Sequence, residues 1–178
     1  MASSDEAALD RAELDRLAGR AGATLEGSHE GAGLRVAVAC ARFNGAITTR
    51  LLEGCLDELV ALGVDPADVT VAWVPGAFEL PLAARAFATA DVGYDAVVTL
   101  GAVVRGETGH YEVVANECAR GVQEVQVVTG TPVVFGVLTC ENVSQALERS
   151  APDETNKGRE AASTAVEMAR LLALPPLT

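Results

Sequence analysis

The order of strand-like and helix-like segments predicts an α/β fold, a parallel sheet covered by helices on both faces. Four short apolar runs, rich in valine, have the length of buried strands. The segments between them repeat apolar residues at helical spacing. The expected strands are "LRVAVAC", which begins at Leu34, "VTVAWV", "YDAVVTLGAVV" and "PVVFGVLT". Read along the chain, the elements alternate as β-α-β-α-β-α-β-α-α, as expected for a parallel sheet whose strands are joined by helical crossovers.

The helix expected after the first strand, "AITTRLLEGCLDELVALG", has the clearest amphipathic pattern. Its apolar face repeats every four residues, at Ile47, Leu51, Cys55 and Leu59. Gly63 fits the C-terminal end of this helix. Further helices are expected over residues 77–90, with Pro81 tolerated only in the first turn, and over 110–128, 142–149 and 156–173.

The composition is that of a packed globular protein. The chain has 178 residues, suited to one domain, and 49% of them are hydrophobic. No apolar run is long enough to cross a bilayer, and the acidic N-terminus lacks a signal-peptide pattern, so a cytoplasmic location is expected. The four cysteines are scattered without a CxxC pair. We therefore expect buried free thiols and neither a disulfide scaffold nor a zinc site.

The formal net charge is −12, and no basic stripe is present. A nucleic-acid partner is therefore not expected. An anionic ligand would have to be held locally, by helix N-termini, backbone N–H groups and a few cations. In open parallel sheets, ligands bind beyond the carboxyl ends of the strands. This rule selects residues 41–46, 75–79, 105–110 and 139–142.

The segment after the third strand holds the most informative candidates. "GAVVRGET" has the glycine and threonine spacing of a phosphate-binding P-loop, but Glu107 replaces the lysine, which argues against a nucleoside triphosphate. A smaller phosphate fits the amides of Gly106 to Thr108; alternatively, Thr108 only caps its own helix. His110 is then either a proton-transfer residue or an exposed polar side chain.

Other candidates have two interpretations each. Phe43 and Phe78 follow strand ends and either stack on a flat ring or pack under a loop. Glu79 accepts hydrogen bonds from a polyol or an amine, or simply favours a helix start. Arg149 and Lys157 flank "SAPDETN" and either bind phosphate or are solvated surface cations.

Five motifs in order resemble the lumazine synthase family: "RFN", "VPGAFELP", "RGETGH", "FGVLT" and "NKGREAA". The resemblance extends from about Leu25 to about Leu172. It implies a flavodoxin-like, three-layer sandwich with a four-stranded parallel sheet. We accordingly divide the chain into an N-terminal extension, residues 1–24, and a domain, residues 25–178. Residues 5–20 favour a short helix, and we expect the chain up to Gly33 to be loosely attached.

The resemblance also implies an activity. Members condense 5-amino-6-(D-ribitylamino)uracil with 3,4-dihydroxy-2-butanone 4-phosphate, which yields 6,7-dimethyl-8-ribityllumazine, phosphate and water. No cofactor or metal is implied. Family members are homopentamers, some of which assemble into icosahedral shells, and the site lies between adjacent subunits. The stiff link around Pro152 is compatible with shell formation but does not decide between the two assemblies.

Matching positions imply roles for individual residues. Phe43 and Phe78 would hold the pyrimidine ring, and Glu79 with the backbone around Ala77 would bind the ribityl chain. His110 would transfer protons.

The remaining roles concern the phosphate and the neighbouring subunit. Gly106, Glu107 and Thr108 would form the phosphate loop. A neighbouring subunit would contribute Phe135, the phosphate-binding Arg149 and Lys157 near the pyrimidine.

Two positions depart from the family pattern. Glu107 stands where a small or neutral residue is common, and Gly109 stands where proline is common. Two alternatives to the enzyme therefore stay open: a paralogue that binds a lumazine or flavin without turnover, and a flavodoxin-type electron carrier, which fits the topology but lacks a flavin-clamping loop pair.

Overall fold

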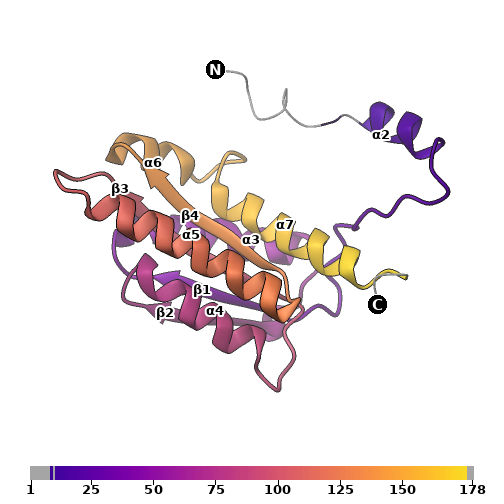
Figure 1. Ribbon diagram of the computed structural model, residues 1–178, viewed down its shortest axis with the longest axis horizontal. Helices are drawn as coiled ribbons and strands as arrows, with labels where there is room; N and C mark the ends of the chain where they lie inside the picture. Colours follow the sequence, from indigo (N-terminus) through magenta and orange to yellow (C-terminus); the bar gives the residue numbers. More distant parts are fainter. Residues whose placement is uncertain (1–8, 10, 176–178) are drawn as a thin grey trace.

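Four parallel strands form the centre of the fold. The computed structural model describes residues 9 and 11–175, and Figure 1 shows the arrangement of the elements. The strands are β1 (Val36–Ala41), β2 (Val69–Val74), β3 (Ala96–Val104) and β4 (Val133–Cys140). They lie in the order β2-β1-β3-β4, and each neighbouring pair is parallel. All four carboxyl ends therefore meet at one edge of the sheet.

The burial of the strands follows their position in the sheet. Every residue of the central strand β1 is buried, as are all residues of β3 except Val104. In the edge strand β2 only Val74 is buried, and in the edge strand β4 five of the eight residues are buried. Because a central strand of a parallel sheet is covered on both faces, its sequence is a continuous apolar run, the pattern seen in "VAVACA".

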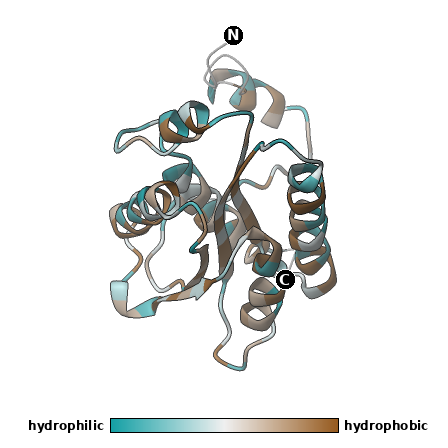
Figure 2. Ribbon diagram, turned by 90° about the vertical axis from the view of Figure 1, so that its left-hand side faces the viewer, coloured by the Kyte–Doolittle hydropathy of each residue, from teal (hydrophilic) through white to brown (hydrophobic). Residues whose placement is uncertain are grey.

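Helices cover both faces of the sheet, which confirms the predicted α/β three-layer fold. The helices α3 (Gly45–Ala61) and α7 (Lys157–Leu172) lie on one face, and α4 (Leu80–Ala88) and α5 (His110–Thr129) lie on the other. A shorter helix, α6 (Val143–Arg149), follows β4. Figure 2 shows the hydrophobic strands between helices whose hydrophilic residues face outward.

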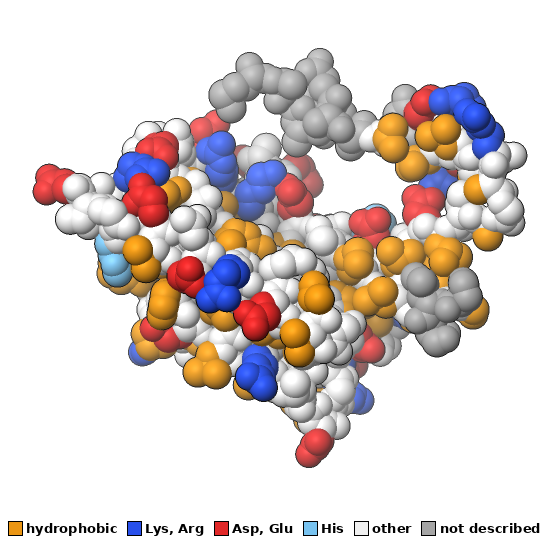
Figure 3. All heavy atoms as spheres, viewed as in Figure 1, with side chains coloured by type: hydrophobic (Ala, Val, Ile, Leu, Met, Phe, Trp, Pro, Cys, Tyr) orange, Lys and Arg blue, Asp and Glu red, His pale blue; other side chains and the backbone are white. Residues whose placement is uncertain are grey.

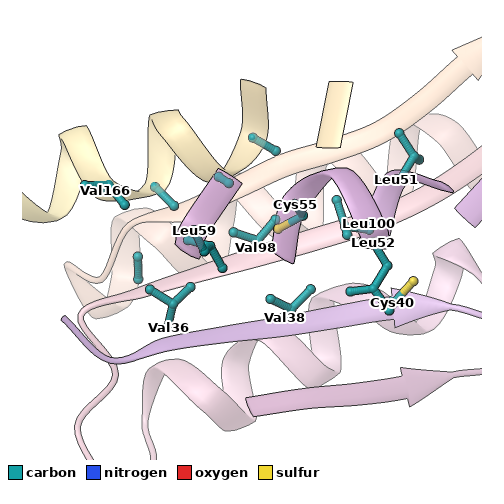
Figure 4. Packing of buried hydrophobic residues seen from close by; sticks show 14 of the residues in the cluster. Val36, Val38, Cys40, Leu51, Leu52, Cys55, Leu59, Val98, Leu100 and Val166 are labelled. Atoms are coloured by element: carbon teal, nitrogen blue, oxygen red, sulfur yellow. The ribbon is translucent and has the colours of Figure 1, made fainter. Parts of the chain in front are cut away.

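The larger hydrophobic cluster lies between the sheet and the α3–α7 pair. Leu51, Cys55 and Leu59 of α3 are fully buried, as the four-residue spacing predicts. Figure 4 shows them above Val38 and Val98 of the central strands. The four cysteines are free and buried. Burial raises the pKa of the Cys40 and Cys55 thiols to about 12 and that of Cys118 to about 11.

α3 and α7 approach closely at small residues. A side chain at Gly158 would collide with the carbonyl oxygen of Leu51, and one at Gly54 would come within 2.6 Å of the Asn156 side-chain oxygen. Asn156 is 2% exposed. Its oxygen accepts a hydrogen bond from the Gly158 N–H at 2.8 Å, so it caps α7 from inside the core. This packing fixes where α7 begins.

Most predicted ends agree with the structure, and one helix differs. α3 is followed by Gly63, whose φ of 92° is a left-handed conformation that favours glycine. The helix predicted over 77–90 is instead a 3₁₀ turn, η2 (Ala77–Glu79), followed by α4. Pro81 explains the break, because it has no N–H to donate to the carbonyl of Ala77. Another short 3₁₀ turn, η1 (Pro66–Asp68), precedes β2.

The N-terminal segment is partly attached to the domain. The expected short helix is present as α2 (Arg11–Ala18), and it has no buried residue. Residues 5–8 and residue 10 of the expected range lie outside the described residues. Loose attachment up to Gly33 is wrong for the second part of the segment. Gly27 and Gly31 are buried, and Arg170 of α7 donates hydrogen bonds to the carbonyl oxygens of Glu30 and Ala32 at 2.6 Å.

None of the helices in the described part of the chain is long and apolar enough to cross a membrane.

Candidate active site

A cavity of about 600 Å³ lies at the carboxyl ends of β1, β2 and β3, where the strand rule places a ligand. Three of the four segments selected from the sequence line it. The fourth, residues 139–142, lies outside this cavity, which is lined by residues of β3, of α5 and of the loops after β1, β2 and β3. Seven of the predicted site residues meet here: Phe43, Ala77, Phe78, Glu79, Gly106, Thr108 and His110.

The loop after β1 is held in an unusual backbone conformation. Asn44 has a φ of 59°, and among the described residues it alone has a positive φ without being glycine. Its side-chain N–H donates to the Ala102 carbonyl oxygen at 2.8 Å. The Phe43 N–H donates to the Pro75 carbonyl oxygen at 3.1 Å, which ties the loops after β1 and β2 together. As a result, Phe43 and Phe78 project from neighbouring loops into the cavity with 70% and 55% exposure.

Glu79 lines the cavity and also stabilises its own turn. One carboxylate oxygen accepts a hydrogen bond from the Gly76 N–H at 2.9 Å, at the start of η2. Through this oxygen Glu79 favours the start of a helical turn, which is one of the two interpretations made from the sequence. The same bond fixes the orientation of the carboxylate, so that its position beside Phe78 and Ala77 is set before any ligand binds.

The loop between β3 and α5 presents Gly106 and Thr108 to the cavity, whereas Glu107 is exposed and does not line it. The Thr108 hydroxyl oxygen accepts a hydrogen bond from the His110 N–H at 3.4 Å, so Thr108 also supports its own helix. His110 is the first residue of α5, with an exposed side chain at the cavity rim. Gly109 has a φ of −65°, a value that other residues, proline included, readily adopt.

Charged residues surround this loop. Arg105 forms ion pairs with Glu112 of α5 and with Glu141 after β4. Hydrogen bonding to Arg105 lowers the pKa of the Glu112 carboxyl below its ordinary value of 4.5. Glu112 is therefore negatively charged at neutral pH, two residues after His110.

A second cavity, of about 430 Å³, lies along β4, the end of α6 and the first half of α7. It is lined by the other three predicted residues, Phe135 of β4, Arg149 at the end of α6 and Lys157 at the start of α7. The Arg149 guanidinium donates to the Gln145 carbonyl oxygen at 3.2 Å, and Lys157 forms an ion pair with Glu160. Two cations thus flank an aromatic ring that is 38% exposed.

The two cavities share no lining residue. A single chain thus presents the candidate residues in two places. The resemblance implied one site shared between two subunits, to which each subunit contributes one of these two groups. Several lining residues were not predicted. Asn44 is part of the "RFN" motif, but its left-handed backbone was not predicted, because asparagine indicates that conformation less strongly than glycine does. Tyr111 and Val114 belong to the helix predicted over 110–128, and they are half-buried residues at the cavity wall.

The described residues contain no cluster of three or more histidine, cysteine or acidic side chains that could hold a metal ion.

Comparison with known protein families shows which family carries these two cavities. The 6,7-dimethyl-8-ribityllumazine synthase family model matches residues 33–173. The chain belongs to the 6,7-dimethyl-8-ribityllumazine synthase family. Members of this family are transferases of riboflavin biosynthesis, so the chain is an enzyme of that class. The match begins at Gly33, directly before β1, and ends directly after α7.

Proposed function

We propose that this enzyme condenses 5-amino-6-(D-ribitylamino)uracil with 3,4-dihydroxy-2-butanone 4-phosphate. The products are 6,7-dimethyl-8-ribityllumazine, phosphate and water. The observation that carries the proposal is the division of the candidate residues: groups suited to a ring, a polyol and proton transfer line one cavity, and two cations with an aromatic ring line another.

The first cavity suits the pyrimidine substrate. The exposed rings of Phe43 and Phe78 offer aromatic faces on which the flat heterocycle stacks. Glu79, fixed by its bond to Gly76, accepts hydrogen bonds from ribityl hydroxyl groups beside the backbone of Ala77. A cavity of about 600 Å³ is large enough for a ligand of this size.

The phosphate of the second substrate is bound by groups from both cavities. The loop from Gly106 to Thr108 supplies amides at the N-terminus of the 20-residue helix α5, whose dipole favours an anion. Glu107 contributes its backbone N–H, and its side chain stays outside the cavity. Arg149 adds a bidentate, permanently charged donor, and Lys157 lies nearer the pyrimidine.

These groups complete one site only if a second copy of the chain supplies the second cavity. We propose that the enzyme is a homopentamer in which Phe135, Arg149 and Lys157 of one subunit face Phe43 and His110 of the next. A cyclic assembly joins two different surfaces in this way at every interface. Shells built from such pentamers are a further possibility that the assembly experiment distinguishes.

The chemistry requires proton transfers that His110 performs. The 5-amino nitrogen attacks the ketone carbon and water leaves as an imine forms. Phosphate leaves next, and the ribitylamino nitrogen then closes the ring with loss of water. An imidazole at the cavity rim accepts and returns protons near neutral pH. Arg149 and the loop amides stabilise the departing phosphate, and the alignment of two bound substrates lowers the entropic cost.

A complementation experiment tests the reaction and the shared site together. His110→Ala and Arg149→Ala are each produced alone and then co-expressed, and lumazine formation is measured with both substrates. If the site is shared, mixed pentamers contain about one intact site in four, so their activity exceeds that of either variant alone. Native mass spectrometry and electron microscopy of the same samples report pentamers or shells.

Two results would contradict the proposal. Wild-type protein that binds a lumazine and is yellow, yet forms no product from the two substrates, would favour the non-catalytic paralogue. Active wild type without any gain in the mixed samples would place the whole site within one subunit.

A further inference from the structure

Arg105 connects three elements at the rim of the first cavity. Its guanidinium forms an ion pair with Glu112, donates from Nε to Glu141 at 2.6 Å, and lies over the ring of Tyr111 with Cζ 4.2 Å from the ring centroid. Its backbone N–H donates to the Cys140 carbonyl oxygen at 2.9 Å, which extends the β3–β4 pairing. Figure 3 shows acidic and basic side chains in contact at this end of the molecule.

The partners of Arg105 belong to the structures that carry the candidate site. Tyr111 and Glu112 directly follow His110 in the first turn of α5, and Tyr111 itself lines the cavity. Glu141 begins the connection to α6. Its N–H donates to the side-chain oxygen of Gln145 in α6 at 2.9 Å, which holds this connection against the helix. One guanidinium therefore fixes the start of α5 against the connection that leads to α6.

The charge of Glu112 gives this contact a second consequence. A carboxylate in the first turn of α5 is attracted to the same helix N-terminus that would bind a phosphate. Without a partner, it would repel the phosphate held by the loop of Gly106 to Thr108. The ion pair with Arg105 offsets this charge, although the side chains of Arg105 and Glu112 are 37% and 47% exposed and water therefore screens the pair.

We propose that Arg105 is a positioning residue for the phosphate-bearing substrate: it holds the first turn of α5 in place and neutralises Glu112 beside the phosphate loop. The inference rests on the proposed function and adds a residue that contacts neither substrate. Arg105 acts through its partners, because it is absent from the lining of both cavities.

The test compares kinetic constants for the two substrates in full-length protein. Arg105→Ala is expected to raise the KM for 3,4-dihydroxy-2-butanone 4-phosphate by about five- to tenfold. The KM for the pyrimidine should stay within about twofold of wild type. The double variant Arg105→Ala/Glu112→Gln removes the unpaired negative charge, and it should recover most of the lost phosphate-substrate affinity.

Arg120→Ala is the matched control. Arg120 lies on the same helix and also pairs with two glutamates, Glu117 at 2.6 Å and Glu124 at 3.3 Å, but it is ten residues beyond His110. Its removal should leave both KM values unchanged. If Arg105→Ala does not fold, Arg105→Gln and Arg105→Lys replace it: the neutral amide should raise the KM for the phosphate substrate, and the ammonium should keep it low.

Two outcomes would overturn the role of Arg105. Either a folded variant keeps the wild-type KM for the phosphate substrate, or both KM values rise together and Glu112→Gln restores nothing, which is the behaviour of a purely structural residue. Wild type is assayed in the same series. An inactive wild type would refute the proposed function, whereas an active wild type with an unaffected variant refutes this inference alone.

Discussion

The side-chain amide of Asn156 donates a hydrogen bond to the carbonyl oxygen of Arg50 at 3.1 Å, and so joins the loop before α7 to α3. The same amide donates to the Ala151 carbonyl oxygen at 2.9 Å. Asn156 is almost completely buried, and its amide connects α3 to the beginning of the loop. Because Lys157 follows it directly, this residue fixes the position at which a candidate substrate-binding cation emerges.

Asn156→Ala should lower the free energy of unfolding by about 1–3 kcal/mol, because it removes two hydrogen bonds to carbonyl oxygens and leaves the buried Gly158 N–H without its acceptor. Urea unfolding at fixed protein concentration measures the change, since an oligomer's stability depends on concentration. Asn116→Ala, at an exposed position of α5, is the control and should leave the midpoint unaltered. A variant of Asn156 as stable as wild type would show that water replaces the amide.

His110→Ala should reduce kcat by about 10²-fold and leave measurable turnover, because alignment of the substrates persists without the imidazole. The only other histidine, His29, pairs with Glu167 at 3.7 Å and lies outside both cavities. His29→Ala should therefore retain the wild-type kcat. Unchanged turnover in the His110 variant would remove this residue from the proton-transfer role.

Arg149→Ala should raise the KM for the phosphate-bearing substrate by about tenfold or more, because a charge-assisted, bidentate donor is lost. Arg85→Ala is a matched control, since each arginine lies in the last turn of its helix and only Arg149 lines a cavity. Steady-state kinetics with each substrate varied in turn separates the two KM values. Kinetics like those of wild type for Arg149→Ala would contradict the assignment.

Gly109→Pro should raise the free energy of unfolding by about 0.4–1 kcal/mol, because it restricts the unfolded chain at a φ that proline adopts. A side chain at Gly109 would meet only the carboxylate of Glu112, at 3.9 Å. Gly130→Pro provides the opposite case. Gly130 has a φ of 72° and its N–H donates to the Gln126 carbonyl, so proline there should destabilise the protein. Thermal unfolding compares the two variants; equal shifts would contradict the backbone explanation.

The order of the elements and the parallel class of the sheet could be predicted without the structure. Hydrophobic periodicity is a local property, so the spacing of Ile47 to Leu59 and the apolar run of β1 could be read without the fold. Gly63 acts through its own backbone geometry, so its effect on the end of α3 was predictable for the same reason. Pro81 was correctly placed in the first turn of a helix, but the 3₁₀ turn that precedes α4 was not predicted. The ends of strands also placed most of the residues of the first cavity.

The contacts between segments far apart in sequence could be seen only in the folded protein. Asn156 and Arg50 are 106 residues apart in sequence, and no local pattern indicates their hydrogen bond. Phe135, Arg149 and Lys157 line a cavity formed by β4, α6 and α7, and α7 packs on one face of the sheet, whereas His110 begins α5 on the other face. The close approach of Gly27 to α7 likewise depends on a helix far along the chain. These relationships arise from packing between distant segments, which a one-dimensional pattern does not contain.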